Sequence, residues 1–116
     1  MAIAIATTRQ SLANSYGALG NWIGVATGAP GTSATPSNEA TGGGYARVQT
    51  TWSAGSGGIE NGTAVTINVA AATYTYALVA SAATTGAANM LDNCTISSVT
   101  LSSPGQLLVT PTYTQT

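Results

Sequence analysis

Residues 64–82 read AVTINVAAATYTYALVASA, and this stretch holds the clearest structural pattern of the chain. Positions 65, 67 and 69 are apolar while positions 66 and 68 are polar, which is the two-residue period of a half-buried β-strand. A second strand is expected over residues 74–82, where tyrosine, threonine, leucine and valine recur. The stretch therefore predicts two strands joined by turn residues at 70–73.

Further strands are expected on both sides of this stretch. The candidates are residues 22–27, 45–52, 90–101 and 106–113, separated by segments rich in Gly, Ser, Thr and Ala. Short strands at regular spacing are typical of an antiparallel sandwich. We expect residues 1–116 to form one mainly β domain, an antiparallel β-sandwich that is Ig-like or jelly-roll-like, with one short N-terminal helix. Its other parts are an N-terminal arm (1–6), the helix (7–19) and a long loop (28–44).

The expected helix over 7–19 has a beginning, an apolar face and an end. Thr7 and Gln10 have the spacing of a capping box, in which each side chain bonds the backbone near the other. Gly20 stands where a left-handed glycine ends many helices. The apolar face follows helical spacing and consists of Leu12, Tyr16 and Leu19. We expect the helix to pack this face against the edge or end of the sheet.

Charged residues are rare in this chain. Two arginines and three carboxylates make up 4% of its 116 residues, whereas about 25% is usual for a soluble domain. A freely diffusing protein normally stays apart from its copies through surface charge. Much of this surface is therefore expected either to be covered by neighbouring subunits or to be solvated through hydroxyl groups alone, which indicates a part of an assembly.

The same composition argues against several partners. Arg9 and Arg47 lie 38 positions apart and the net charge is −1, so the clustered positive charge of a nucleic-acid-binding protein is not expected. No run of 18 strongly apolar residues predicts a membrane span. The first six residues contain no basic residue, so no secretory signal is expected.

The residues that carry enzyme chemistry are also scarce. Without histidine or lysine there is no ordinary general base for a nucleophilic triad, and a single cysteine, Cys94, cannot supply a zinc site. Glu39, Glu60 and Asp92 lie in or beside three different loops, so a pair of catalytic carboxylates has no support. Calcium, held by loop carboxylates and carbonyls, is the metal alternative that stays open. We expect no catalytic residue, no cofactor and no metal.

A longer pattern joins the middle of the chain to its late part. It consists of Gly43-Gly44-Tyr45-Ala46-Arg47-Val48, Trp52-Ser53-Ala54, Gly57-Gly58-Ile59-Glu60-Asn61 and the late Gly86-Ala87-Ala88-Asn89-Met90-Leu91. This order resembles a family of small virion proteins of tailed bacteriophages that are often labelled tail fibre or structural protein. The resemblance covers roughly positions 7 to 110. It implies a structural protein of the virion, made in the cytoplasm of the host bacterium.

Composition and resemblance together give a functional hypothesis. We expect a non-enzymatic capsid decoration subunit that stabilises the shell by binding the assembled state, with the major capsid protein or tail proteins as partners. A homo-oligomer is expected, for example a trimer. The alternative is a tail-associated fibre or tip protein that binds a host receptor or carbohydrate, with Tyr45, Trp52, Asn61 and Asp92 as a possible sugar platform.

Contact residues are expected in the arm, in the long loop and among the tyrosines, since tyrosine and arginine favour interfaces. The residues we expect at partner contacts are Ile3, Ile5, Pro30, Pro36, Glu39, Arg47, Tyr74 and Tyr76. The two tyrosines are expected to be exposed. Two roles are open for Arg47: a local salt bridge or stacking on an aromatic ring, or a contact between subunits.

Overall fold

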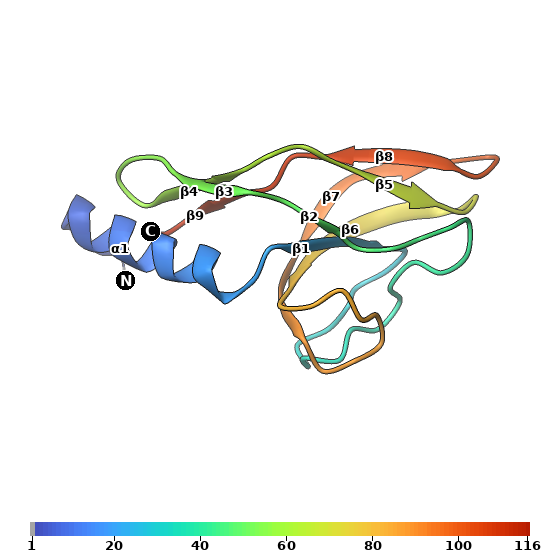
Figure 1. The fold of residues 1–116 in the computed structure, drawn as a ribbon, viewed down its shortest axis with the longest axis horizontal. Coiled ribbons are helices and arrows are strands. Elements are labelled where there is room, and N and C mark those ends of the chain that lie inside the picture. Colours follow the sequence, from blue (N-terminus) through green and yellow to red (C-terminus); the bar gives the residue numbers. More distant parts are fainter. Residues whose placement is uncertain (1) are drawn as a thin grey trace.

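The computed structural model describes residues 2–116, so Met1 of the expected arm lies outside the described residues. The chain is mainly β with one helix, and its extents are 46 × 24 × 23 Å (Figure 1). The elements are α1 (Ala6–Leu19), β1 (Trp22–Ala26), β2 (Val48–Gln49), β3 (Trp52–Ala54), β4 (Ile59–Gly62), β5 (Val65–Val69), β6 (Thr73–Ala80), β7 (Met90–Thr100), β8 (Gly105–Val109) and β9 (Thr112–Thr114). Among residues 2–116, no helix is long and apolar enough to cross a membrane.

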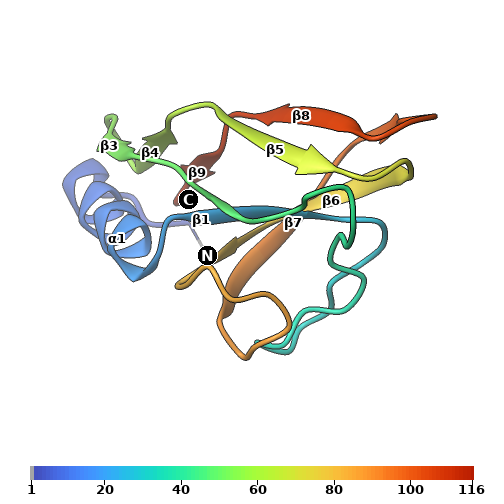
Figure 2. The ribbon, with the colours of Figure 1, turned by 45° about the vertical axis from the view of Figure 1, so that its right-hand side comes forward.

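Three antiparallel sheets form the body of the protein. One has the strand order β2-β1-β6-β7, the second is the pair β5-β8, and the third has the order β3-β4-β9. The pair β5-β8 lies over the four-stranded sheet, while α1 lies beside β3, β4 and β9 at the other end of the molecule (Figures 1 and 2). The expected antiparallel, sandwich-like fold is confirmed.

The main core fills the space between the four-stranded sheet and β5-β8. The predicted alternation in β5 is confirmed, because positions 65, 67 and 69 are buried and positions 66 and 68 are exposed. The buried members of this core are Ile23, Val25, Ala40, Val65, Ile67, Val69, Tyr74, Val79 and Leu107. A smaller cluster of Leu78, Ala80 and Met90, with Trp22 against it, packs separately.

Two predicted strands are each divided in the structure. The expected strand 45–52 becomes β2 and β3, and residues 45–47 precede β2 without strand structure. The expected strand 106–113 becomes β8 and β9, with a break next to Pro111, which has no backbone N–H to donate. β4 was not predicted, although it pairs with both β3 and β9. It is short and contains two polar residues and a glycine, so it lacks a two-residue apolar pattern.

The predicted helix is present, but both predicted end signals are wrong. The N-cap is Ile5, and no side chain caps this end of the helix. Gln10 instead reaches β4: its Nε2 donates to Ile59 O at 2.9 Å, and its Oε1 accepts from the backbone N–H of Gly58 and Ile59. Gly20 has an extended φ of 174°, and a Cβ there would lie 2.5 Å from Ala80 O. Gly20 is therefore needed for space and not for a left-handed turn.

The predicted packing face of the helix is also largely wrong. Ala13 is fully buried, whereas Leu12 and Leu19 are 43% and 61% exposed. Only Tyr16 of the expected face turns toward the body, where its ring stacks on Tyr113 with centroids 3.7 Å apart. α1 thus packs through Tyr16 together with small and polar residues, while Leu12 and Leu19 face outward.

Candidate functional site

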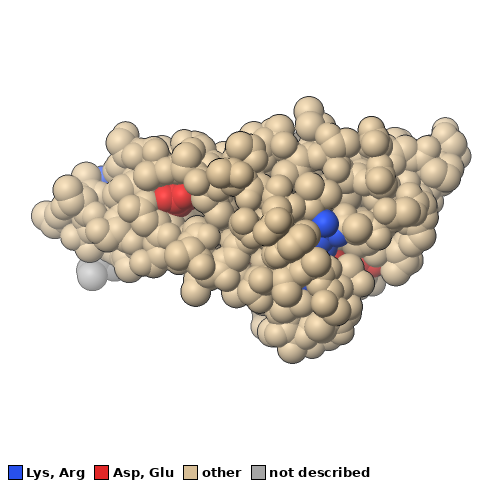
Figure 3. All heavy atoms as spheres, viewed as in Figure 1, with Lys and Arg blue, Asp and Glu red and all other residues tan. Residues whose placement is uncertain are grey.

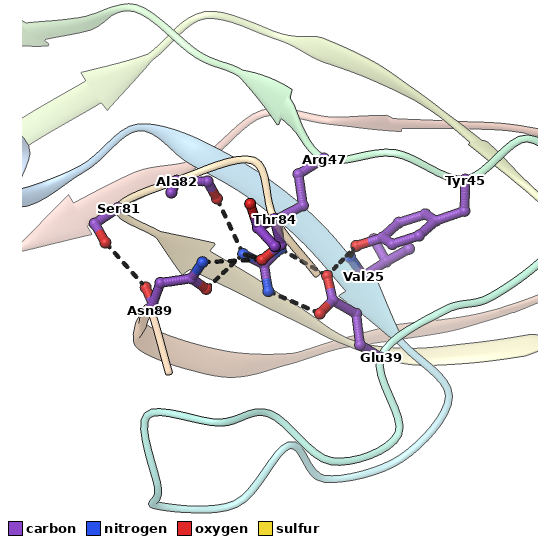
Figure 4. Close-up of polar contacts among 8 residues, drawn as sticks. All are labelled: Val25, Glu39, Tyr45, Arg47, Ser81, Ala82, Thr84 and Asn89. Atoms are coloured by element: carbon purple, nitrogen blue, oxygen red, sulfur yellow. Dashed lines mark hydrogen bonds and ion pairs between the residues drawn. The ribbon is translucent and has the colours of Figure 1, made fainter. Parts of the chain in front are cut away.

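A buried ion pair joins the long loop to the segment before β2 (Figure 4). Arg47 Nε donates to Glu39 Oε2 at 2.7 Å, and Arg47 Nη2 donates to Glu39 Oε1 at 2.8 Å. This is the two-point geometry that makes arginine–carboxylate pairs strong. The side chain of Arg47 is 0% exposed and that of Glu39 is 7% exposed, so the pair is shielded from solvent.

The remaining polar atoms of the pair are also engaged. Arg47 Nη1 donates to three oxygens of the 82–89 segment: Ala82 O, Thr84 O and Asn89 Oδ1, at 2.7–3.0 Å. Tyr45 donates its hydroxyl proton to Glu39 Oε2 at 2.6 Å. A buried pair needs such additional hydrogen bonds to offset the loss of water from both charges.

Electrostatics keeps both donors protonated. Burial alone would lower the pKa of Arg47, but the hydrogen bonds and the charge of Glu39 outweigh it and raise that pKa. Burial, and then the hydrogen bond to Glu39, raises the pKa of Tyr45 well above its ordinary value. Of the two roles left open for Arg47, the structure contains the salt bridge within the chain.

This network connects three loop segments above strand β1. Glu39 comes from the long loop, Tyr45 and Arg47 from the segment before β2, and Asn89 from the segment before β7. β1 lies beneath them, and the N–H of Val25 donates to the Tyr45 oxygen at 3.3 Å. Gly24 is required here, because a Cβ at this position would overlap the Tyr45 hydroxyl. The network therefore has a structural role in positioning the loops.

An open groove of about 450 Å³ lies between the strands β6 and β7 and the residues 109–114. β6 and β7 line it together with residues 109–114, and Tyr16 and Trp52 contribute their aromatic rings. These two rings meet edge to face, with centroids 6.2 Å apart. Its surface is mainly apolar, with Asp92 and Cys94 from β7 as the groups able to ionise beside the tyrosines.

Tyr16 and Cys94 of the groove are held in their protonated forms, which are poor nucleophiles and bases. Tyr16 donates its hydroxyl proton to Asp92 Oδ2 at 3.0 Å, and burial followed by the nearby Asp92 raises the pKa of Tyr16. Burial and Asp92 also raise the pKa of the Cys94 thiol, which disfavours the reactive thiolate. Across residues 2–116, no group of three or more His, Cys, Asp or Glu side chains is placed to hold a metal ion.

Several of the predicted contact residues are buried or bonded within the chain. The expectation that Tyr74 is exposed is wrong, since it is fully buried in the main core and donates its hydroxyl proton to Ala70 O. Pro30 and Arg47 are buried, and Glu39 is occupied by Arg47. Ile5 is exposed, and the half-buried residues of the set are Ile3, Pro36 and Tyr76. As partner contacts, all eight residues remain predictions.

The suggested sugar platform does not assemble as one surface. Trp52 and Asp92 line the groove, but Tyr45 and Asn61 are not among its lining residues. Trp52 is half-buried, and its indole N–H donates to Gly20 O at 2.9 Å. Trp22 is half-buried against the smaller cluster. Both tryptophans therefore contribute to internal packing.

The outer surface is almost free of charge, as the view in Figure 3 shows for one face. Large apolar side chains occur on it instead. The exposed ones are Ile5, Leu12, Leu19, Leu91, Val99 and Leu108. Three of these come from α1 or its N-cap, so the helix is the richest single source of exposed apolar surface.

The sequence did not predict the structural roles of Asn89 and Gln10, although both residues stand in the quoted motifs. Asn89 completes the arginine network from more than 40 positions away, and Gln10 bonds a strand that was not predicted. The rarity of charge was the one available hint for Arg47, because only three carboxylates could pair with it.

Fold and surface together define a β-rich structural module with a weakly charged exterior. The pattern of the family described as Podophage GP4 fiber I protein gp80 matches residues 7–112. The chain therefore belongs to this family of phage fibre proteins and is a structural protein of the virion. No curated protein and no solved structure matches it. The family match confirms the resemblance to phage virion proteins that the GYARV-containing pattern indicated.

Proposed function

We propose that the chain is a non-enzymatic subunit of a virion fibre, and that it acts through contacts with copies of itself and with tail proteins. The observation that carries this proposal is the family match over residues 7–112, nearly the whole chain. The alternative of the sequence analysis, a tail-associated fibre protein, is thus favoured over a decoration subunit.

The geometry supports an architectural role within the fibre. The groups that chemistry would need are already engaged: Glu39 with Arg47, and Asp92 with Tyr16. Glu60 is buried beneath α1, where the Asn14 carboxamide is placed to donate to it. A rigid body whose polar groups bond one another, with apolar side chains left on its surface, suits lateral assembly.

A capsid decoration subunit is the second candidate. Its support is the weakly charged surface, which would let copies crowd on a shell without mutual repulsion. Receptor or carbohydrate binding is a third role, and it has less support because both tryptophans are used in packing.

Copy number and location in purified particles distinguish these roles. Particles are dissociated so that heads and tails separate, and the chain is quantified by mass spectrometry in each fraction against the major capsid protein. A few to some tens of copies in the tail fraction would support the fibre subunit. Hundreds of copies with the heads would refute it in favour of decoration, and absence from particles would refute both.

A further inference from the structure

The helix α1 packs Tyr16 on the body of the protein but leaves its large aliphatic side chains exposed. Ile5 at its N-cap is 60% exposed, and Leu12 and Leu19 are 43% and 61% exposed. The side that faces the body offers the small residues Ala13 and Gly17. A surface helix normally buries its large apolar side chains, so the outward row (Ile5, Leu12 and Leu19) indicates a second packing surface.

The spacing of the outward row points to another helix as the occupant. Its members stand seven residues apart, which is two turns of a helix, so they lie along one line. A row with this spacing supplies one of the two inward positions of each seven-residue repeat between helices that wind around each other, and the other position is taken by the small polar residues Thr8 and Ser15. An identical helix presents the identical repeat, so each apolar layer of one copy meets an apolar layer of the next.

Charge also favours self-association of this face. Arg9 is the only charged residue of α1, and it is directed to the body: its Nε donates to Gly57 O at 2.8 Å and its Nη1 donates to Ile3 O. The residues between the members of the row are Ala, Thr, Ser and other uncharged types on the outward side. Two copies of the face therefore meet without like-charge repulsion.

We propose that α1 packs against α1 of other copies of this chain through Ile5, Leu12 and Leu19, and that this contact joins the subunits of the fibre. The inference rests on the proposed function only in naming the fibre as the assembly. Identical helices related by a symmetry axis make such a contact self-complementary.

The helix row needs neighbouring surface to make a stable contact. α1 has 14 residues and is thus about 21 Å long, while a stable interface covers about 800 Å² on each partner. Leu91 provides part of it, because its exposed side chain lies against Gly20, directly after Leu19. The apolar patch therefore continues from the helix onto the start of β7.

Oligomeric state in solution tests this proposal. The mass of the purified chain is measured by light scattering after size exclusion, beside the double variant Leu12→Glu/Leu19→Glu and the control Leu108→Glu. Leu108 is 73% exposed on β8, so its replacement removes a comparable apolar side chain away from the helix. We expect an oligomer for the wild type and the control, and a monomer with an unchanged circular dichroism spectrum for the double variant.

A wild-type chain that is monomeric at high micromolar concentration would overturn the proposal. So would a double variant that remains oligomeric. Neither outcome touches the proposed function, which depends on the location and copy number of the chain in particles.

Disulfide trapping adds a test that does not depend on weakening the contact. Leu12 is the middle member of the row and meets its counterpart whichever way the helices run. Leu12→Cys and Leu108→Cys are compared in a Cys94→Ser background, because Cys94 is exposed and would crosslink by itself. Rapid oxidative crosslinking of Leu12→Cys alone supports the helix contact. Equal or slower crosslinking than that of Leu108→Cys contradicts it.

Discussion

Replacing Arg47 with methionine should strongly lower the free energy of unfolding of the chain. Methionine keeps much of the apolar stem and removes the guanidinium. The Glu39 side chain is then left 7% exposed, and within residues 2–116 the Tyr45 hydroxyl is its remaining side-chain donor. Ala82, Thr84 and Asn89 lose the donor that their oxygens share.

The expected cost follows from the burial of the pair. Removing one partner of a buried ion pair costs about 3–5 kcal/mol, mostly because the other charge stays buried. At about 0.05–0.15 kcal/mol per residue, the 116-residue chain has a total stability of about 6–17 kcal/mol. The substitution therefore removes a large part of the free energy of unfolding, and the melting temperature should fall by about 12–20 °C.

Urea and thermal unfolding followed by circular dichroism measure this loss. Arg9→Met is the matched control. Arg9 bonds two backbone oxygens, so its loss leaves no buried charge without a partner and should lower the free energy of unfolding less, by about 1.5–3 kcal/mol. The double variant Arg47→Met/Glu39→Gln removes both charges and should be more stable than Arg47→Met alone. A loss below about 1 kcal/mol for Arg47→Met, or a double variant less stable than the single one, would refute the reasoning.

Three further outcomes are expected. Gly24→Ala should lower the free energy of unfolding by about 1–3 kcal/mol, because its methyl group overlaps the Tyr45 hydroxyl. In unfolding assays, adding Tyr45→Phe should restore part of this loss. The control Gly105→Ala should have little effect, since the nearest atom to its methyl group is 3.6 Å away. Gln10→Ala should cost about 1–3 kcal/mol in the same assays, since the bonds to β4 are lost. Because the fold raises the pKa of Tyr45, the protonated hydroxyl contributes to stability at every pH below the unfolded pKa of about 10. This contribution is lost as the pH rises above that value. Melting temperature should thus fall above that pH, and less steeply in Tyr45→Phe.

Local patterns predicted the strands whose two faces differ clearly. β5 alternates between buried and exposed positions as its sequence does, and β6 begins within one residue of the expected start. β4 has no such pattern, because its place is set by pairing with β3 and with the distant β9. The position of a strand of this kind depends on long-range hydrogen bonds, which a local pattern does not encode.

The buried network was predictable in type but not in membership. Two arginines and three carboxylates leave few possible ion pairs, and a local salt bridge was one of the two roles considered for Arg47. The choice of Glu39 depends on how the long loop folds back, which is seen in the bridge between Ala26 and Glu39. The burial of Tyr74 has a similar origin: its strand position was predicted, while the face it occupies depends on the irregular pairing of β6 with β7 next to it.

The helix shows why a correct element can still be assigned the wrong face. Periodicity places Leu12 and Leu19 on one side of α1 but does not say which partner that side meets. Within the chain, the close approach of α1 to β4 needs small residues, and Ala13 and Gly17 meet that need better than leucine. The leucines are then left for a partner outside the chain. In a protein with so little surface charge, an apolar row of this kind belongs to the assembly as much as to the fold.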